Sequence, residues 1–133
     1  MSRVSVGRPE NPVKKTKPFV EPFLPLTPAA FQILVVLADG ERHGYAIMRE
    51  VTTRTLGGMR LGPGTLYGAI SRLLADGLIE EGGEQFDPEL GESRRRYYRL
   101  TTLGRRVAVA QARHLYELVR LARSKRLIGE EAV

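Results

Sequence analysis

The stretch from Gly62 to Glu81 constrains the fold more than any other part of the chain. A helix can begin at Pro63, because proline lacks only an N–H that the first helical turn leaves unbonded. Gly77 can adopt the left-handed conformation that ends a helix. Apolar residues recur between these points at steps of three and four, which places them on one helical face. They are Leu66, Ile70, Leu73 and Leu74. The pattern predicts a helix over 63–76 that buries this face.

The opposite face of this helix carries small or hydrogen-bonding side chains and one long cation. A solvated helix face normally carries Glu, Lys and Gln, and a glycine inside a helix costs about 1 kcal/mol relative to alanine. A face of low relief suits a helix whose backbone closely approaches another surface, and the major groove of DNA is such a surface. The residues of this outer face are Gly64, Thr65, Gly68, Ser71, Arg72 and Ala75.

Two further helices are predicted before this one. Thr27 followed by Pro28 has the pattern of an N-cap and a first helical residue, and we expect Gly40 to end that helix. A second helix is expected over 43–56, ended by two glycines. We expect His43 to serve as a cap or turn residue, because a catalytic histidine needs a nucleophile or carboxylate partner and none lies nearby in sequence. The inner face of the second helix is predicted to hold Ile47, Val51 and Leu56.

A two-stranded hairpin is predicted after the central helix, with strands at 78–81 and 94–100 and an acidic loop over 82–93. One short bridge of strand is expected near 59–61. Neighbouring residues of a strand point to opposite faces, so we expect one of Tyr97 and Tyr98 to enter the core.

A last helix is predicted over 102–126, capped by Thr101 or Thr102. It carries two adjacent apolar stripes, which together are wider than one contact surface requires. We expect one stripe to pack on the domain and the other on a second copy of the chain. The predicted dimer residues are Val107, His114, Leu115, Leu118 and Leu121.

The 133 residues are predicted to form one globular unit with extensions. We divide the chain into a basic, proline-rich arm over 1–26, a compact domain over 27–101, the last helix over 102–127 and a tail over 128–133. The net charge is +6, and residues 94–126 hold eleven basic residues and one acid. An excess of this sign favours polyanionic partners such as nucleic acid.

Composition also excludes several classes of function. The chain has no cysteine, which rules out disulfides and thiolate metal sites. It has neither a glycine-rich phosphate loop followed by lysine nor paired carboxylates in an apolar setting, so we predict that it is not an enzyme. We expect no cofactor, no metal and no catalytic residue. No apolar run approaches the roughly 18 residues that cross a bilayer, and we expect a cytoplasmic, nucleoid-associated protein without membrane contact.

The order of these elements predicts the fold class. Three helices, a hairpin and a long helix form a mainly α fold with a small β-hairpin, the layout of a winged helix-turn-helix followed by a dimerisation helix. Arg94, Arg95 and Arg96 open the second hairpin strand, just after the central helix. On a wing they would hold DNA phosphates, a contact that positions a protein without reading sequence.

Four motifs in this order resemble one known family. They are His-Gly-Tyr-Ala-Ile at 43–47, Gly-Thr-Leu-Tyr-Gly-Ala-Ile-Ser-Arg-Leu at 64–73, Gly-Leu-Ile at 77–79, and Arg-Tyr-Tyr-Arg-Leu-Thr at 96–101 with Gly-Arg at 104–105. Together they resemble the PadR family of transcriptional regulators over roughly residues 27–122. The resemblance implies a dimeric winged-helix repressor that binds operator DNA. It carries DNA-contacting positions over to Tyr45, Thr65, Tyr67, Ser71, Arg72 and the wing arginines.

The leading hypothesis is therefore a sequence-specific regulator, a repressor that binds double-stranded operator DNA at an inverted repeat as a homodimer. The alternative is a winged-helix module for protein–protein assembly whose basic surface is merely solvated. The salt dependence of DNA binding separates these two hypotheses. A small-molecule effector of unidentified chemistry remains a candidate further partner.

Overall fold

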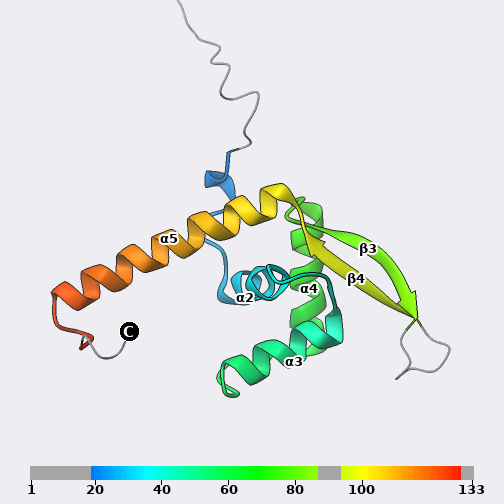
Figure 1. The fold of residues 1–133 in the computed structure, drawn as a ribbon, viewed down its shortest axis with the longest axis horizontal. Helices are drawn as coiled ribbons and strands as arrows, with labels where there is room; N and C mark the ends of the chain where they lie inside the picture. Colours follow the sequence, from blue (N-terminus) through cyan, green and yellow to red (C-terminus); the bar gives the residue numbers. More distant parts are fainter. Residues whose placement is uncertain (1–18, 87–93, 130–133) are drawn as a thin grey trace, which may run out of the picture.

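The computed structural model describes residues 19–86 and 94–129, which form a helical body with a projecting hairpin and one long helix (Figure 1). The elements in chain order are the 3-10 helix η1 (Glu21–Phe23), α2 (Pro28–Leu37), β2 (Arg42–His43), α3 (Gly44–Arg54), α4 (Pro63–Ala75), β3 (Ile79–Phe86), β4 (Arg94–Leu100) and α5 (Thr102–Ser124). This mainly α architecture confirms the predicted fold class. The part of the predicted arm before residue 19 lies outside the described residues.

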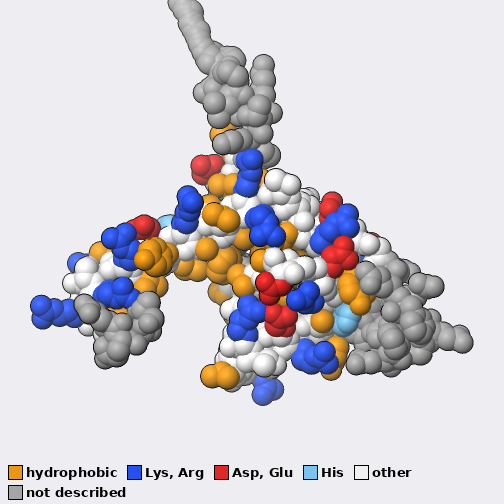
Figure 2. All heavy atoms as spheres, in the orientation of Figure 1, with side chains coloured by type: hydrophobic (Ala, Val, Ile, Leu, Met, Phe, Trp, Pro, Cys, Tyr) orange, Lys and Arg blue, Asp and Glu red, His pale blue; other side chains and the backbone are white. Residues whose placement is uncertain are grey.

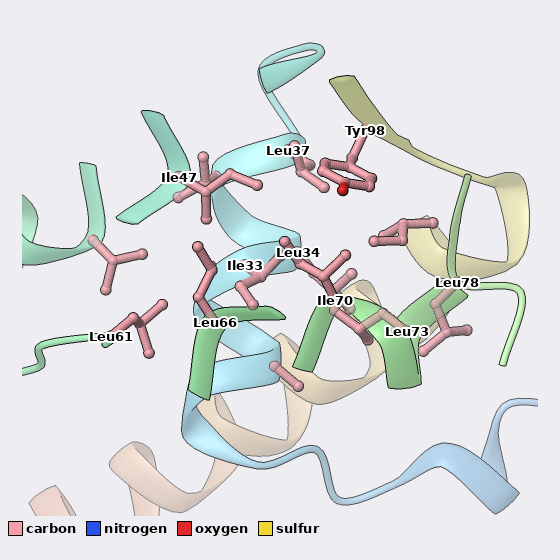
Figure 3. Close-up of a cluster of buried hydrophobic side chains, with 14 of the residues drawn as sticks. Ile33, Leu34, Leu37, Ile47, Leu61, Leu66, Ile70, Leu73, Leu78 and Tyr98 are labelled. Carbon is pink, nitrogen blue, oxygen red and sulfur yellow. The ribbon is translucent and has the colours of Figure 1, made fainter. Parts of the chain in front are cut away.

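Helix α2 lies at the centre of the body and contacts α3, α4, α5 and β4. It begins as predicted, because the Thr27 side chain accepts a hydrogen bond from the Ala30 N–H and Pro28 occupies the first helical position. Ile33 and Leu34 are fully buried, and Figure 3 shows them among the apolar side chains of the neighbouring elements. A helix that is apolar on nearly all sides is stable only where other elements surround it.

Helices α3 and α4 follow the sequence pattern closely. Gly77 has a φ of +76°, the left-handed conformation expected after α4. One prediction was wrong: Leu56 does not belong to the inner face of α3. The helix ends at Arg54, and Leu56 lies in the following turn with a φ of +55° and 93% of its surface exposed.

The sheet has three antiparallel strands in the order β2-β4-β3. Strand β2 was not predicted; its two residues, Arg42 and His43, pair with Tyr98 and Tyr97. The bridge expected near 59–61 is absent from the described sheet, in which β2 pairs with the second edge of β4. Strand β3 extends to Phe86, beyond the predicted end at 81, and carries a bulge between Glu81 and Gly83. The rest of the predicted acidic loop, from residue 87 to 93, lies outside the described residues.

Helix α5 is divided along its length. Its first half crosses the body, where Val107 is fully buried and Gln111 is nearly so. The Gln111 side-chain oxygen accepts a hydrogen bond of 2.9 Å from the Leu26 N–H, which fastens the segment before α2 to this helix. Residues 112–121 are exposed, and the second half of α5 extends away from the body (Figure 1). The prediction that one stripe packs on the domain along the whole helix was therefore wrong, because only the first half of α5 lies against the body.

The start of α5 is locked against the turn that follows α4. Thr101 caps α5 by accepting a hydrogen bond from the Gly104 N–H, and its hydroxyl donates to the Gly77 carbonyl at 2.6 Å. A Cβ on Gly104 would lie 1.9 Å from the Leu78 carbonyl oxygen. Only a glycine permits this approach, because the obstacle is backbone and not a side chain that could move away.

We predict that Gly104→Ala lowers the free energy of unfolding by about 1–3 kcal/mol, the usual cost of overpacking a tight site. Urea denaturation followed by circular dichroism measures the change. Gly64→Ala is the matched control, because a Cβ there would meet no atom within 4 Å and should leave stability equal or higher. An unchanged midpoint for Gly104→Ala would contradict the proposed contact.

Candidate nucleic-acid interface

The outer face of α4 is exposed along its whole length. Leu66, Ile70 and Leu73 are buried against the core, with 1–2% of their surface accessible. A helix is rigid, so this burial turns the opposite side chains outward. The exposed residues of α4 include all those predicted for its outer face, namely Gly64, Thr65, Gly68, Ser71, Arg72 and Ala75.

The glycines on this outer face have no packing role within the chain. A Cβ on Gly64 or Gly68 would meet no atom within 4 Å, and neither residue has a positive φ. The fold would therefore accept alanine at both positions, and alanine would favour the helix by about 1 kcal/mol at each. What glycine provides here is a smooth surface over which another molecule can approach the backbone.

The two tyrosines predicted to contact DNA lie where α3 begins beside the first turns of α4. A Cβ on Gly44 would lie 2.5 Å from the Tyr67 hydroxyl, so the absence of a side chain there makes room for this phenol. Tyr67 is still 48% exposed, and Tyr45 is 43% exposed. The Arg49 guanidinium lies 5.2 Å from the centre of the Tyr45 ring, a cation–π contact.

His43 holds the start of α3 in place. Its Nδ1 accepts a hydrogen bond of 3.0 Å from the Ala46 N–H, which makes it the N-cap of the helix. Its ring also meets the Tyr97 ring edge to face, with 5.3 Å between the centres. The predicted role at a cap is confirmed.

Tyr97 and Tyr98 point to different sides of β4, as predicted. Tyr98 is buried and joins the core (Figure 3), whereas Tyr97 is half-buried beside His43. Burial raises the pKa of the Tyr98 hydroxyl, and the nearby Tyr67 raises it further. Tyr98 therefore keeps its proton at neutral pH, and no buried charge arises beneath α4.

The positive charges of Arg96 and Arg99, at the base of the wing, are partly offset by carboxylates of β3 and of the segment before β2. Arg96 forms an ion pair of 3.4 Å with Glu81, and Arg99 donates to Glu80 at 2.8 Å and to Glu41 at 3.1 Å. The hydrogen bonds to Glu80 and Glu41 raise the pKa of Arg99 above its usual value. The backbones of Arg94 and Arg95 pair with Phe86 and Gln85, and their side chains lie outside the described part of the wing.

The predicted dimer residues lie in two different environments. Val107 is completely buried inside the protomer, which removes it from any surface that a partner could contact. The remaining four, His114, Leu115, Leu118 and Leu121, are exposed on the projecting half of α5. Figure 2 shows hydrophobic side chains gathered along the side of this half that faces the hollow beside the body.

Within the ranges 19–86 and 94–129, no three His, Cys, Asp or Glu side chains come close enough to hold a metal ion. Among the helices described, none is long and apolar enough to cross a membrane.

The motifs at α3, α4 and the hairpin fall within residues 33–111, which match the model of the Transcriptional regulator PadR-like family. Among curated proteins, the Transcriptional regulator Rv3488 of Mycobacterium tuberculosis is 39% identical over 88 residues, which are 66% of this chain and 76% of that protein. The chain belongs to the PadR-like family. The prediction of a transcriptional regulator, and not an enzyme, is confirmed by this membership.

Two other similar proteins are longer than this chain. An uncharacterized 37.1 kDa protein in transposon TN4556 of Streptomyces fradiae is 38% identical over 90 residues, or 68% of this chain, but the matched part is only 24% of that protein's length. Bacillus subtilis PadR, solved in complex with operator DNA, is 20% identical with a TM-score of 0.56, and the match covers 65% of this chain and 47% of that one. This last likeness establishes a shared fold.

Two cations beside the PadR helix-turn-helix were missed from the sequence. Arg49 follows Tyr45 by four residues on α3, and this spacing alone could have indicated that the two side chains meet. Arg60 lies in the turn before α4 and belongs to no recognisable motif. Only the folded structure brings the two residues to one groove.

We predict that Gly68→Ala in this PadR protein raises the free energy of unfolding by about 1 kcal/mol and at the same time weakens DNA binding. The added methyl group favours the helix but stands on the outer face of α4. Ser124→Ala on α5 is the control, since it also favours a helix but lies far along the chain from that face. Equal DNA affinity for Gly68→Ala and the wild type would show that the low relief serves no DNA contact.

Proposed function

We propose that this PadR-family regulator is a homodimeric repressor that inserts α4 of each protomer into the major groove of an inverted-repeat operator. The observation that carries the proposal is the outer face of α4. It combines two glycines without packing partners with exposed hydroxyls and one cation. A surface of this kind lets a helix backbone approach base edges while Thr65, Ser71 and Arg72 form hydrogen bonds with them.

Operator DNA is the favoured ligand for two further reasons. The Bacillus subtilis PadR that shares this fold was solved on operator DNA. The net charge of +6 also attracts a polyanion and steers it toward the protein. Binding at an operator would place the protein at the nucleoid.

We assign the other predicted residues to the DNA backbone. Tyr45 and Tyr67 lie half exposed beside the first turns of α4, where a hydroxyl can donate to a phosphate oxygen. Arg94, Arg95 and Arg96 open the wing strand and would add phosphate contacts. Because Arg96 is already paired with Glu81, its contribution should be smaller than that of an arginine without a carboxylate beside it.

The projecting half of α5 supplies the proposed dimer surface. Leu118 and Leu121 are 56% and 51% exposed, although one face of the first half of the same helix packs on the core through Val107. Large apolar side chains gathered on one exposed face favour association with another protein surface. A second copy of the chain places an identical helix there, and its two-fold symmetry requires an operator that is an inverted repeat.

Repression follows from the position of such a dimer. A protein bound across an operator excludes other proteins from the same DNA by its bulk. Transcription from a promoter that contains the selected site should therefore fall when the purified protein is added to RNA polymerase. A rise in transcript would overturn the assignment as a repressor and leave the DNA-binding assignment intact.

The central test is binding of the purified protein to duplexes selected from a random library. We expect an inverted repeat whose half-sites are centred about one helical turn apart, or a multiple of a turn. The logarithm of affinity should fall linearly with the logarithm of salt concentration, by about 0.9 for each phosphate contact. Failure to enrich any sequence, with no salt-dependent binding, would favour the assembly-module alternative.

Arg72 is predicted to contribute to operator recognition at a base edge or at a phosphate. It is the one cation on the outer face of α4. Arg72→Ala should weaken operator binding by about 1–3 kcal/mol if the arginine makes a bidentate contact with guanine. Fluorescence anisotropy on the selected operator measures the loss. Unchanged affinity in a folded variant would remove Arg72 from the interface.

Leu118→Glu is predicted to give a folded monomer with weak, non-specific DNA binding, because it would place a charge inside the proposed dimer surface. Sedimentation reports the oligomeric state, and circular dichroism reports folding. Leu56→Glu is the matched control for oligomeric state, because Leu56 is 93% exposed but lies in the turn between α3 and α4. A Leu118→Glu variant that stays dimeric would move the interface away from the projecting half of α5.

A further inference from the structure

An open groove of about 500 Å³ lies between α3 and the turn that leads into α4. One wall comes from a single face of α3, where residues recur at steps of three and four. The other wall comes from the residues just before α4. The full lining is Tyr45, Met48, Arg49, Thr52, Arg60, Leu61 and Gly62. Two arginines from different elements therefore meet at one groove.

The two groove arginines differ in their ion pairing from the other arginines of this region. In the described ranges, neither Arg49 nor Arg60 forms an ion pair. Arg42 and Arg54, in contrast, both pair with Glu50, and the Arg42–Glu50 distance is 3.7 Å. Glu50 thus offsets part of the positive charge on one side of α3, whereas the two groove arginines keep their full charge among the described residues. Figure 2 shows Lys and Arg side chains gathered over α3 at the lower edge of the molecule.

Arg49 is held in place before any ligand arrives. Its guanidinium lies 5.2 Å from the centre of the Tyr45 ring. A long side chain that already packs on an aromatic ring loses less conformational freedom when it binds. The Thr52 hydroxyl in the groove donates its hydrogen to the Met48 carbonyl at 3.0 Å, whereas Arg49 and Arg60 carry the positive charge.

The groove adjoins the helix that we propose to enter DNA. Gly62 is both part of its lining and the N-cap of α4. A Cβ on Gly62 would meet no atom within 4 Å, so the wall between the groove and the outer face of α4 is low. A DNA strand whose bases face the first turns of α4 can continue across this wall with its phosphates over the groove.

We propose that this groove is a phosphate-binding site for the operator backbone, in which Arg49 and Arg60 each neutralise a phosphodiester. It lies at the N-terminal end of α4, whereas the wing begins after the C-terminal end. The site therefore fixes the end of α4 that the wing does not hold. This inference rests on the proposed function. Its open shape and exposed arginines suit a passing nucleic-acid strand better than an enclosed small anion.

The experiment compares Arg49→Gln, Arg60→Gln and the double variant by fluorescence anisotropy over a range of salt concentrations. The probes are the selected operator and a mixed-sequence duplex. Each single change should reduce the steepness of the salt dependence by about 0.9, the effect of one lost phosphate contact. Both duplexes should lose affinity by the same factor, because phosphate contacts do not distinguish sequences.

Two sets of controls accompany these variants. Arg126→Gln removes an exposed arginine beyond the end of α5 and should leave the salt dependence unchanged. Arg49→Lys and Arg60→Lys keep the positive charge and should restore most of the wild-type slope. Circular dichroism of every variant ensures that a changed slope does not arise from unfolding.

Wild-type slopes in folded Arg49→Gln and Arg60→Gln would overturn the phosphate site while leaving the proposed function standing. A loss confined to the operator would also overturn it, since it would show that the arginines read bases. If the wild type itself bound neither duplex, the proposed function would fail before the groove came into question.

Discussion

The burial of one face of α4 against α2 is the interaction on which the rest of the structure depends. Leu66, Ile70 and Leu73 are almost wholly inaccessible, and they pack with Ile33 and Leu34 in one core (Figure 3). Each such side chain contributes about 1.5–3 kcal/mol when it leaves water. Because a helix cannot rotate without losing this burial, the same contacts hold Thr65, Ser71 and Arg72 outward.

Glycine serves two opposite purposes around this helix. At Gly104 the fold has no room for a side chain, because a Cβ would lie 1.9 Å from the Leu78 carbonyl oxygen, and at Gly44 a Cβ would displace the Tyr67 hydroxyl, which would lie 2.5 Å away. At Gly64 and Gly68 there is room, and glycine costs the helix stability. Gly44 and Gly104 allow α3 and α5 to approach α4 and the turn after it, whereas Gly64 and Gly68 leave the outer face of α4 smooth. Alanine should therefore lower the stability of the fold at Gly104, whereas at Gly64 and Gly68 it should raise the stability and weaken DNA binding.

The arginines proposed to contact DNA fall into two groups, those paired with carboxylates and those without such a pair among the described residues. On the wing, Arg96 and Arg99 meet carboxylates from β3 or from the segment before β2. Along the groove beside α3, Arg49 and Arg60 have no carboxylate partner among the described residues. A phosphate that approaches Arg96 must compete with Glu81, whereas one that approaches the groove does not. The proposed contacts at the two ends of α4 should thus differ in strength.

Helix α5 connects the proposed DNA-binding face of α4 to the proposed dimer surface. Its start is fixed to the turn after α4 through Thr101 and Gly104, and its middle is fixed through the hydrogen bond between Gln111 and Leu26. The exposed half continues as the same rigid helix. A second copy that packs on this half would therefore take a defined position relative to α4, which is what an operator with fixed half-site spacing requires.

Local patterns in the sequence determined the helices, their caps and the two faces of α4, because these features depend on residues only a few positions apart. Thr27, His43 and Gly77 are cases in which one side chain, or its absence, sets a local conformation. Tertiary structure decided the rest. Strand β2 is two residues long, too short for any periodicity, and exists only because β4 offers it an edge. Helix α5 is buried only as far as the body extends beneath it, and the periodicity of its sequence does not show where the body ends. The meeting of Arg49 with Arg60, and of Arg96 with Glu81, depends on how separate elements pack, which no short stretch of sequence contains.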